Sequence, residues 1–104
     1  MKTITAGHRY ELENFEAKNQ PGQVIQFIEK VPVPGQPGQL ATMNDGTTNE
    51  EVMKMLIDRL QSLYDKFPSE ETYVTISFLK VALYAQQLRT YERQQRGVEG
   101  KHIK

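Results

Sequence analysis

The sequence has no cysteine, only two histidines, and no apolar run that approaches the length of a membrane span. The lack of cysteine excludes disulfides, thiolate nucleophiles and cysteine zinc sites. His8 and His102 stand near opposite ends of the chain, so no histidine pair has the spacing of metal ligands. Because neither a run of about 20 apolar residues nor a signal segment is present, we expect a cytoplasmic protein without metal, cofactor or membrane contact.

Net charge is also lacking, since 13 basic residues balance 13 acidic ones. Without a positive field, the chain is poorly suited to binding duplex nucleic acid. The length of 104 residues is typical of one domain, but a hydrophobic content of 38% is low for a compact monomer. We therefore expect part of the core to lie between copies of the chain.

The N-terminal part is predicted to form a β-hairpin. Tyr10 and Leu12 alternate with charged residues, and residues 24–28 form a second short run of strand-forming residues. Between these runs, residues 20–23 (QPGQ) favour a type II turn with a positive φ at Gly22. An isolated hairpin is marginal in water, so it should pack on the helices or on a second copy.

The next segment, residues 31–47, has the composition of a connector. Three prolines and two glycines within residues 31–38 exclude an interior strand or helix there. Residues 40–43 are able to add a short edge strand before the turn-forming residues 44–46 (NDG).

Two amphipathic helices follow the connector. Thr48 is a good N-cap, Glu51 completes a capping box, and apolar residues then recur at steps of three and four until Pro68 ends the helix. Ser69 caps a second helix, which we expect over residues 70–96. The predicted fold is α+β: a small antiparallel β-sheet or hairpin followed by an antiparallel two-helix hairpin.

In this prediction the single domain, residues 1–104, has four segments. They are a β-hairpin (1–30), the Pro/Gly-rich connector (31–47), the helical hairpin (48–96) and a C-terminal tail (97–104).

The second helix has more apolar surface than one antiparallel neighbour can cover. Its two adjoining stripes are Val74, Phe78, Val81, Ala85 and Leu88, and Ile76, Leu79 and Leu83. The sheet or a second protomer should cover the remainder, and a symmetric homodimer is the commonest solution.

The C-terminal end of this helix is the best candidate for binding an anion. Arg89, Arg93 and Arg96 are spaced i, i+4 and i+7, so they share one helix face ahead of Gly97. Arginine forks suit phosphate oxygens, and Tyr91 adds an aromatic face on the same turns. A solvated face favoured by the helix dipole explains the same spacing, so both interpretations stay open.

Catalytic groups are not evident in the sequence. The acidic pairs at residues 50–51 and 70–71 fall in first helical turns, where negative charge is expected for electrostatic reasons. Residues 34–38 (PGQPG) lead into no helix and lack the lysine of a P-loop. A binding protein is therefore predicted rather than an enzyme.

Most of the chain resembles the phage anti-defence signal sponges, which include anti-Thoeris and anti-CBASS proteins. Three segments resemble the helical-hairpin domain that these proteins share: TNEEVMKMLIDRLQSL (48–63), KFPSEETYVTISFLKVAL (66–83) and LRTYERQQRGVEGKH (88–102). The segments AGHRYELENFE (6–16) and QVIQFIEKV (23–31) are similar to the small antiparallel sheet of the anti-Thoeris branch.

This resemblance implies a non-enzymatic sponge, which sequesters a cyclic nucleotide-like immune messenger without cleaving it. In the anti-Thoeris branch the messenger is a glyco-cyclic ADP-ribose isomer made by a TIR-domain enzyme, and related members hold CBASS cyclic oligonucleotides. The resemblance also implies action in the cytoplasm of the infected bacterial cell, as homodimers or hexamers (trimers of dimers) with ligand buried at subunit edges.

The resemblance implies that Arg89 and Arg93, the arginines of the family's R-T-x-x-R segment, contact ligand. Thr72 and Ser62 stand where the family tends to have an asparagine and an aromatic residue, and these replacements remove an amide contact and a stacking contact. Three nearby aromatic residues are candidates for the stacking role: Tyr64, Phe67 and Tyr73.

A different class of function fits the same helix end. A helical, oligomeric adaptor would use its arginines to bind an acidic protein surface and would need no nucleotide. Uptake of a cyclic nucleotide separates the two hypotheses.

Overall fold

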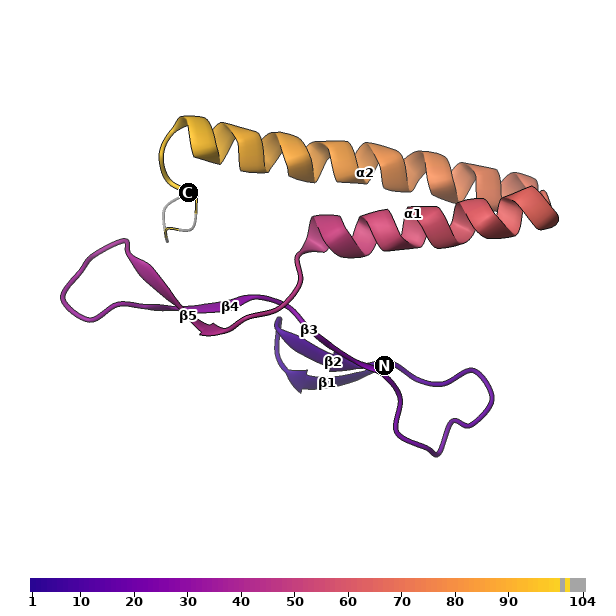
Figure 1. The fold of residues 1–104 in the computed structure, drawn as a ribbon, viewed down its shortest axis with the longest axis horizontal. Coiled ribbons are helices and arrows are strands. Elements are labelled where there is room, and N and C mark those ends of the chain that lie inside the picture. Colours follow the sequence, from indigo (N-terminus) through magenta and orange to yellow (C-terminus); the bar gives the residue numbers. More distant parts are fainter. Residues whose placement is uncertain (100, 102–104) are drawn as a thin grey trace. The chain divides into compact units, whose positions relative to one another are not determined.

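The computed structural model describes residues 1–99 and 101 and divides into two compact units, with the boundary between Thr48 and Asn49. In the described residues the first unit contains strands β1 to β5 and the second contains helices α1 and α2 (Figure 1). The predicted α+β class, with a small antiparallel sheet preceding a helical hairpin, is confirmed. The predicted C-terminal tail (97–104) lies partly outside the described residues.

The first sheet has one strand more than the predicted hairpin. Its antiparallel strands lie in the order β1 (Lys2–Thr5), β2 (Arg9–Glu11) and β3 (Val24–Gln26). Tyr10 pairs with Ile25, so the two apolar runs do pair as predicted. All four residues of β1 are exposed, and this strand depends on backbone pairing with β2 rather than on an apolar pattern that the sequence could have revealed.

The connection between β2 and β3 is not the predicted type II turn, because Gly22 does not have a positive φ. A Cβ atom on Gly22 would collide with the backbone oxygen of Leu12, and the N–H of Leu12 donates to the oxygen of Gln23 over 2.8 Å. Glycine is therefore needed for a close approach of two backbone segments. The amide of Asn14 organises the loop by donating to the carbonyl oxygens of Ala17, Gln20 and Pro21.

The segment predicted as a connector, residues 31–47, contains parts of two strands. β4 (Glu29–Pro32) pairs antiparallel with β5 (Leu40–Asn44) in a second sheet, and only the short strand near 40–43 had been anticipated. Each strand of a two-stranded sheet has an open edge, so Pro32 is tolerated without a backbone donor. The other prolines of the segment lie in the loop at the hairpin tip.

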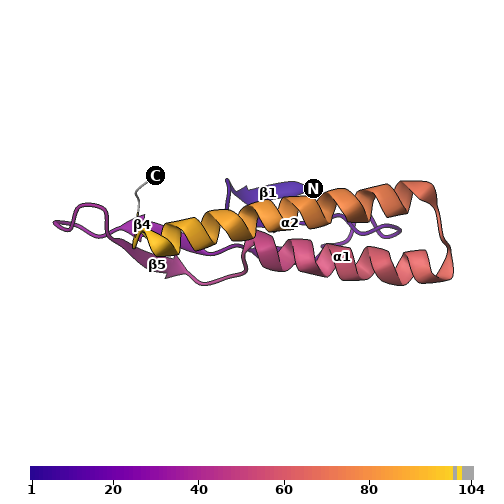
Figure 2. The ribbon, with the colours of Figure 1, turned by 90° about the horizontal axis from the view of Figure 1, so that it is seen from above.

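The helices begin and end close to the predicted residues. α1 spans Asn49–Lys66 and α2 spans Glu70–Gln95, and the two run antiparallel side by side (Figures 1 and 2). Ser69 is the N-cap of α2, and its hydroxyl oxygen accepts from the N–H of Thr72 at 3.1 Å.

The C-terminal end of α2 is closed by a Schellman motif. Gly97 has a φ of 70°, its N–H donates to the oxygen of Gln94, and the N–H of Val98 donates to the oxygen of Arg93. Glycine suits this position because the left-handed conformation strains residues that have a Cβ atom.

α1 covers only one of the two apolar stripes of α2. The inner stripe contains Ile76, which is 6% exposed, and the half-buried Leu79 and Leu83. Within the described residues, Ile76 is the only fully buried apolar side chain. The outer stripe is exposed along its whole length and consists of Val74, Phe78, Val81, Ala85 and Leu88.

Candidate functional site

The predicted site residues fall into two groups at opposite ends of the helical hairpin. The turn-end cluster lies near the α1–α2 connection and consists of Ser62, Phe67 and Thr72. The arginine end lies at the last turns of α2 and consists of Arg89, Tyr91, Arg93 and Arg96.

The separation between these groups is set by the helix itself. Thr72 and Arg89 are 17 residues apart on α2, which corresponds to roughly 26 Å at 1.5 Å per residue. A single copy of the hairpin therefore does not bring both groups to one small ligand.

At the turn end, Thr72 takes part in the helix cap. Its N–H donates to the Ser69 hydroxyl oxygen, and the Ser69 hydroxyl donates to Thr72 Oγ1 at 2.9 Å. Phe67 is 77% exposed and Ser62 is also exposed. Thr72 therefore has a local structural role, whereas Phe67 presents its ring to solvent.

A hollow of about 440 Å³ lies beside this cluster and is lined by Tyr64, Pro68, Ser69, Glu70 and Tyr73. The rings of Tyr64 and Tyr73 are 6.2 Å apart and inclined by 47°. Two aromatic side chains favour a flat aromatic ring such as a nucleobase, while the carboxylate of Glu70 disfavours phosphate. The hollow is of a size that holds part of a nucleotide.

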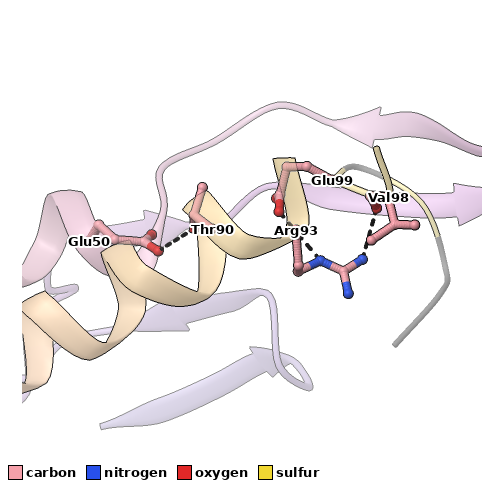
Figure 3. Close-up of polar contacts among 5 residues, drawn as sticks. All are labelled: Glu50, Thr90, Arg93, Val98 and Glu99. Carbon is pink, nitrogen blue, oxygen red and sulfur yellow. Dashed lines mark hydrogen bonds and ion pairs between the residues drawn. The ribbon is translucent and has the colours of Figure 1, made fainter. Parts of the chain in front are cut away.

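Arg93 differs from the other arginines because its side chain is buried. The residue is 8% exposed, Nη2 donates to the oxygen of Val98 at 2.9 Å, and Nε lies 3.4 Å from Glu99 Oε2 (Figure 3). The solvated-face interpretation is therefore wrong for Arg93. Arg89 and Arg96 are exposed, as is Tyr91, at 58%.

A second polar contact ties the arginine end to the start of α1. Thr90, between Arg89 and Arg93, donates from Oγ1 to Glu50 Oε1 over 3.2 Å (Figure 3). Sequence reasoning treated Glu50 only as a first-turn charge. The contact joins residues 40 apart, so it depends on how the two helices are aligned.

The contacts of Val98 and Glu99 were likewise missed, although a local signal for them existed. Glycine at position 97 predicts a reversal of the chain after α2, and such a reversal returns the following residues to the last turn. The bend at Gly97 brings the Val98 oxygen and the Glu99 carboxylate to Arg93.

Residues 1–99 and 101 contain no group of three histidine, cysteine, aspartate or glutamate residues able to hold a metal ion. The same residues also contain no helix that is long and apolar enough to cross a membrane.

The chain was compared with known proteins. No family model matches it, and no solved structure matches it. It is 39% identical over 88 residues to the protein named Thoeris anti-defense 1 of Bacillus phage SBSphiJ7, and the match covers 73% of this chain. The same match spans 62% of the relative's length, which is less than two thirds. With this identity over most of its length, the chain belongs to the anti-Thoeris family.

Proposed function

We propose that this protein is a phage-encoded immune-evasion sponge, which binds a cyclic nucleotide-like messenger of bacterial immunity and holds it without cleavage. The observation that carries the proposal is its 39% identity to a protein named for its action against Thoeris defence. The proposed ligand is a glyco-cyclic ADP-ribose made by a TIR-domain enzyme, with CBASS cyclic oligonucleotides as further ligands. The protein would act inside the infected bacterial cell.

The chemistry of the two groups supports a ligand of this kind. Exposed Arg89 and Arg96 suit phosphate oxygens, whereas the rings of Tyr64 and Tyr73 suit a base. A cyclic dinucleotide-like molecule carries both features. Because the groups lie roughly 26 Å apart on one copy of α2, we propose that each site takes residues from two copies.

The outer stripe supports a specific arrangement of those copies. Arg89 and Tyr73 are each eight residues from Val81. Two antiparallel α2 helices related by a two-fold axis at Val81 would therefore bring Arg89 of one copy level with Tyr73 of the other. This arrangement places the arginine end of one copy level with the turn end of the other along the helices, twice per dimer.

Side-chain sizes along the outer stripe suit the same register. Val74 and Leu88 are each seven residues from Val81, so they would lie level across the axis. Phe78 and Ala85 lie three and four residues from the axis, so the large ring of Phe78 in one copy would meet the small side chain of Ala85 in the other. The dimer would cover a stripe that includes Phe78, which is 70% exposed in one copy.

The experiment that tests the sponge is uptake and release. The protein is incubated with TIR-derived cyclic ADP-ribose isomers or with cyclic oligonucleotides, separated from free ligand and heated, and the released molecule is analysed by mass spectrometry. Release of intact ligand at one molecule per copy supports the proposal. An altered product would indicate an enzyme instead.

The adaptor hypothesis predicts the opposite result in the uptake experiment. The exposed Arg89, Tyr91 and Arg96 equally suit an acidic protein surface. No uptake of any of these nucleotides, together with salt-sensitive binding to a bacterial protein, would favour the adaptor.

A substitution refines the test of the site. Arg89→Ala is expected to weaken ligand binding by about 2 to 5 kcal/mol, as for one partner of a buried charge pair. Arg89→Lys keeps the charge without the fork, so full recovery of affinity by lysine would contradict bidentate recognition. Lys54→Ala, an exposed cation of α1 outside both groups, is the matched control and should leave affinity unchanged.

A further inference from the structure

In the part of the chain that the structure describes, the partners of the Arg93 guanidinium group include the Val98 oxygen and the Glu99 carboxylate. We infer that the Glu99 carboxylate is an internal substitute for a ligand phosphate, and that a phosphate that binds the Nε–Nη2 edge of Arg93 must first displace it. The inference rests on the proposed function, because it concerns the regulation of the same arginine end.

The geometry of the contacts makes the internal acceptors and a phosphate alternatives. Nε and Nη2 of Arg93 lie along one edge of the guanidinium plane, and they face Glu99 Oε2 at 3.4 Å and the Val98 oxygen at 2.9 Å (Figure 3). A phosphate engages this kind of edge with two of its oxygens. Both sets of acceptors cannot occupy the edge at the same time.

Burial leads to the same conclusion. Arg93 is 8% exposed and its Nε–Nη2 edge faces Val98 and Glu99, so a ligand reaches this edge only when both acceptors move away. Arg89, one turn earlier on α2, is exposed and needs no such movement. Arg89 therefore makes the first contact with the ligand, and Arg93 joins after the exchange of acceptors.

The internal ion pair is weak enough to be exchanged. The Nε to Oε2 distance of 3.4 Å is long for a charge-assisted hydrogen bond, and the Glu99 side chain is 39% exposed. A ligand with two phosphates offers shorter bonds and more charge. A weakly charged anion would not gain enough to displace the carboxylate, so the contact selects for pyrophosphate-like ligands.

The test compares three variants with the wild type, using glyco-cyclic ADP-ribose as the probe and calorimetry to measure affinity. Glu99→Gln removes the charge and keeps the size, and Glu99→Ala removes the acceptor. Glu92→Gln makes the same change of charge at an exposed glutamate on the last turns of α2, and it is the matched control. A nitrogen-15 NMR spectrum follows the Arg93 Nε–H signal, and circular dichroism verifies that each variant is folded.

Both Glu99 variants should bind the probe about three- to tenfold more tightly than the wild type, because the competing internal state is weakened. Glu92→Gln should stay within about twofold of the wild type. The Arg93 Nε–H signal should shift in Glu99→Gln, and in the wild type when ligand is added, but not in Glu92→Gln. A purely structural contact would predict lower stability in the Glu99 variants without any gain in affinity.

Two failures are distinguishable in this experiment. If the wild type binds the probe while the Glu99 variants bind equally or more weakly, the inference is overturned and the sponge stands. An equal gain in all three variants would also overturn it, since net charge alone would explain the result. If no version of the protein binds the probe, the proposed ligand is wrong and the inference falls with it.

Discussion

The two sides of α2 differ in burial although both carry large apolar residues. Ile76 on the inner stripe is 6% exposed, whereas Phe78 on the outer stripe is 70% exposed. Hydrophobicity does not explain this difference, because isoleucine and phenylalanine are both among the residues most often buried in proteins. The explanation is geometric, since a single antiparallel neighbour covers one side of a helix. An exposed apolar stripe of this length is typical of an interaction surface.

The largest effect is expected from charge on the outer stripe. Val81→Asp should weaken self-association more than about 100-fold, because like charges would face each other across the proposed axis and each would lose water. Sedimentation equilibrium measures the association constant. Thr75→Asp makes the same change of charge away from the outer stripe and should leave association intact. A wild-type protein that is a folded monomer at micromolar concentration would contradict the proposed dimer.

A substitution in the inner stripe should lower the stability of the protein. Ile76→Ala is expected to lower the free energy of unfolding by about 2 to 4 kcal/mol, since it removes buried methyl groups and leaves a cavity against α1. Urea unfolding followed by circular dichroism gives the value. Val81→Ala, measured at a concentration where the protein is monomeric, should lower the free energy of unfolding by well under half as much. Equal losses for the two variants would mean that the inner and outer stripes are equally buried in one copy.

The two arginines of the R-T-x-x-R segment extend the comparison from apolar to charged side chains. Arg93→Ala should lower the free energy of unfolding by about 1 to 3 kcal/mol, because the Val98 oxygen loses a charged donor and a buried side chain is removed. Arg89→Ala should change it by about 0.5 kcal/mol at most, as is usual for exposed sites. Thermal unfolding of both variants measures these two losses of stability. Similar losses would show that the contacts of the Arg93 side chain with Val98 and Glu99 are not maintained in solution.

A modest loss of stability is expected when the helix cap at the turn end is removed. Ser69→Ala is expected to cost about 1 kcal/mol, since the N–H of Thr72 loses its acceptor. Ser77→Ala is the matched control, because the Ser77 hydroxyl donates to the Tyr73 oxygen in mid-helix, where alanine is neutral or slightly stabilising. Urea unfolding of the pair distinguishes a cap from an ordinary helical serine.

Local signals explain why much of the helical unit was predictable. Pro68 and Ser69 mark the boundary between the helices, Gly97 marks the end of α2, and all three act through residues within one turn. The grouping of α2 residues into two stripes follows from helical periodicity alone.

The other features join residues that are distant in sequence, and only the tertiary structure decided them. β1 and β4 were not predicted as strands, because their backbones are ordered by partners elsewhere in the chain. Periodicity defined both stripes of α2, but the position of α1 determined which one is covered. In the same way, sequence spacing aligned Arg89 with Arg93, and the chain reversal at Gly97 buried one guanidinium while the other stayed in water. A pattern along the chain records which residues share a face, whereas burial depends on what packs against that face.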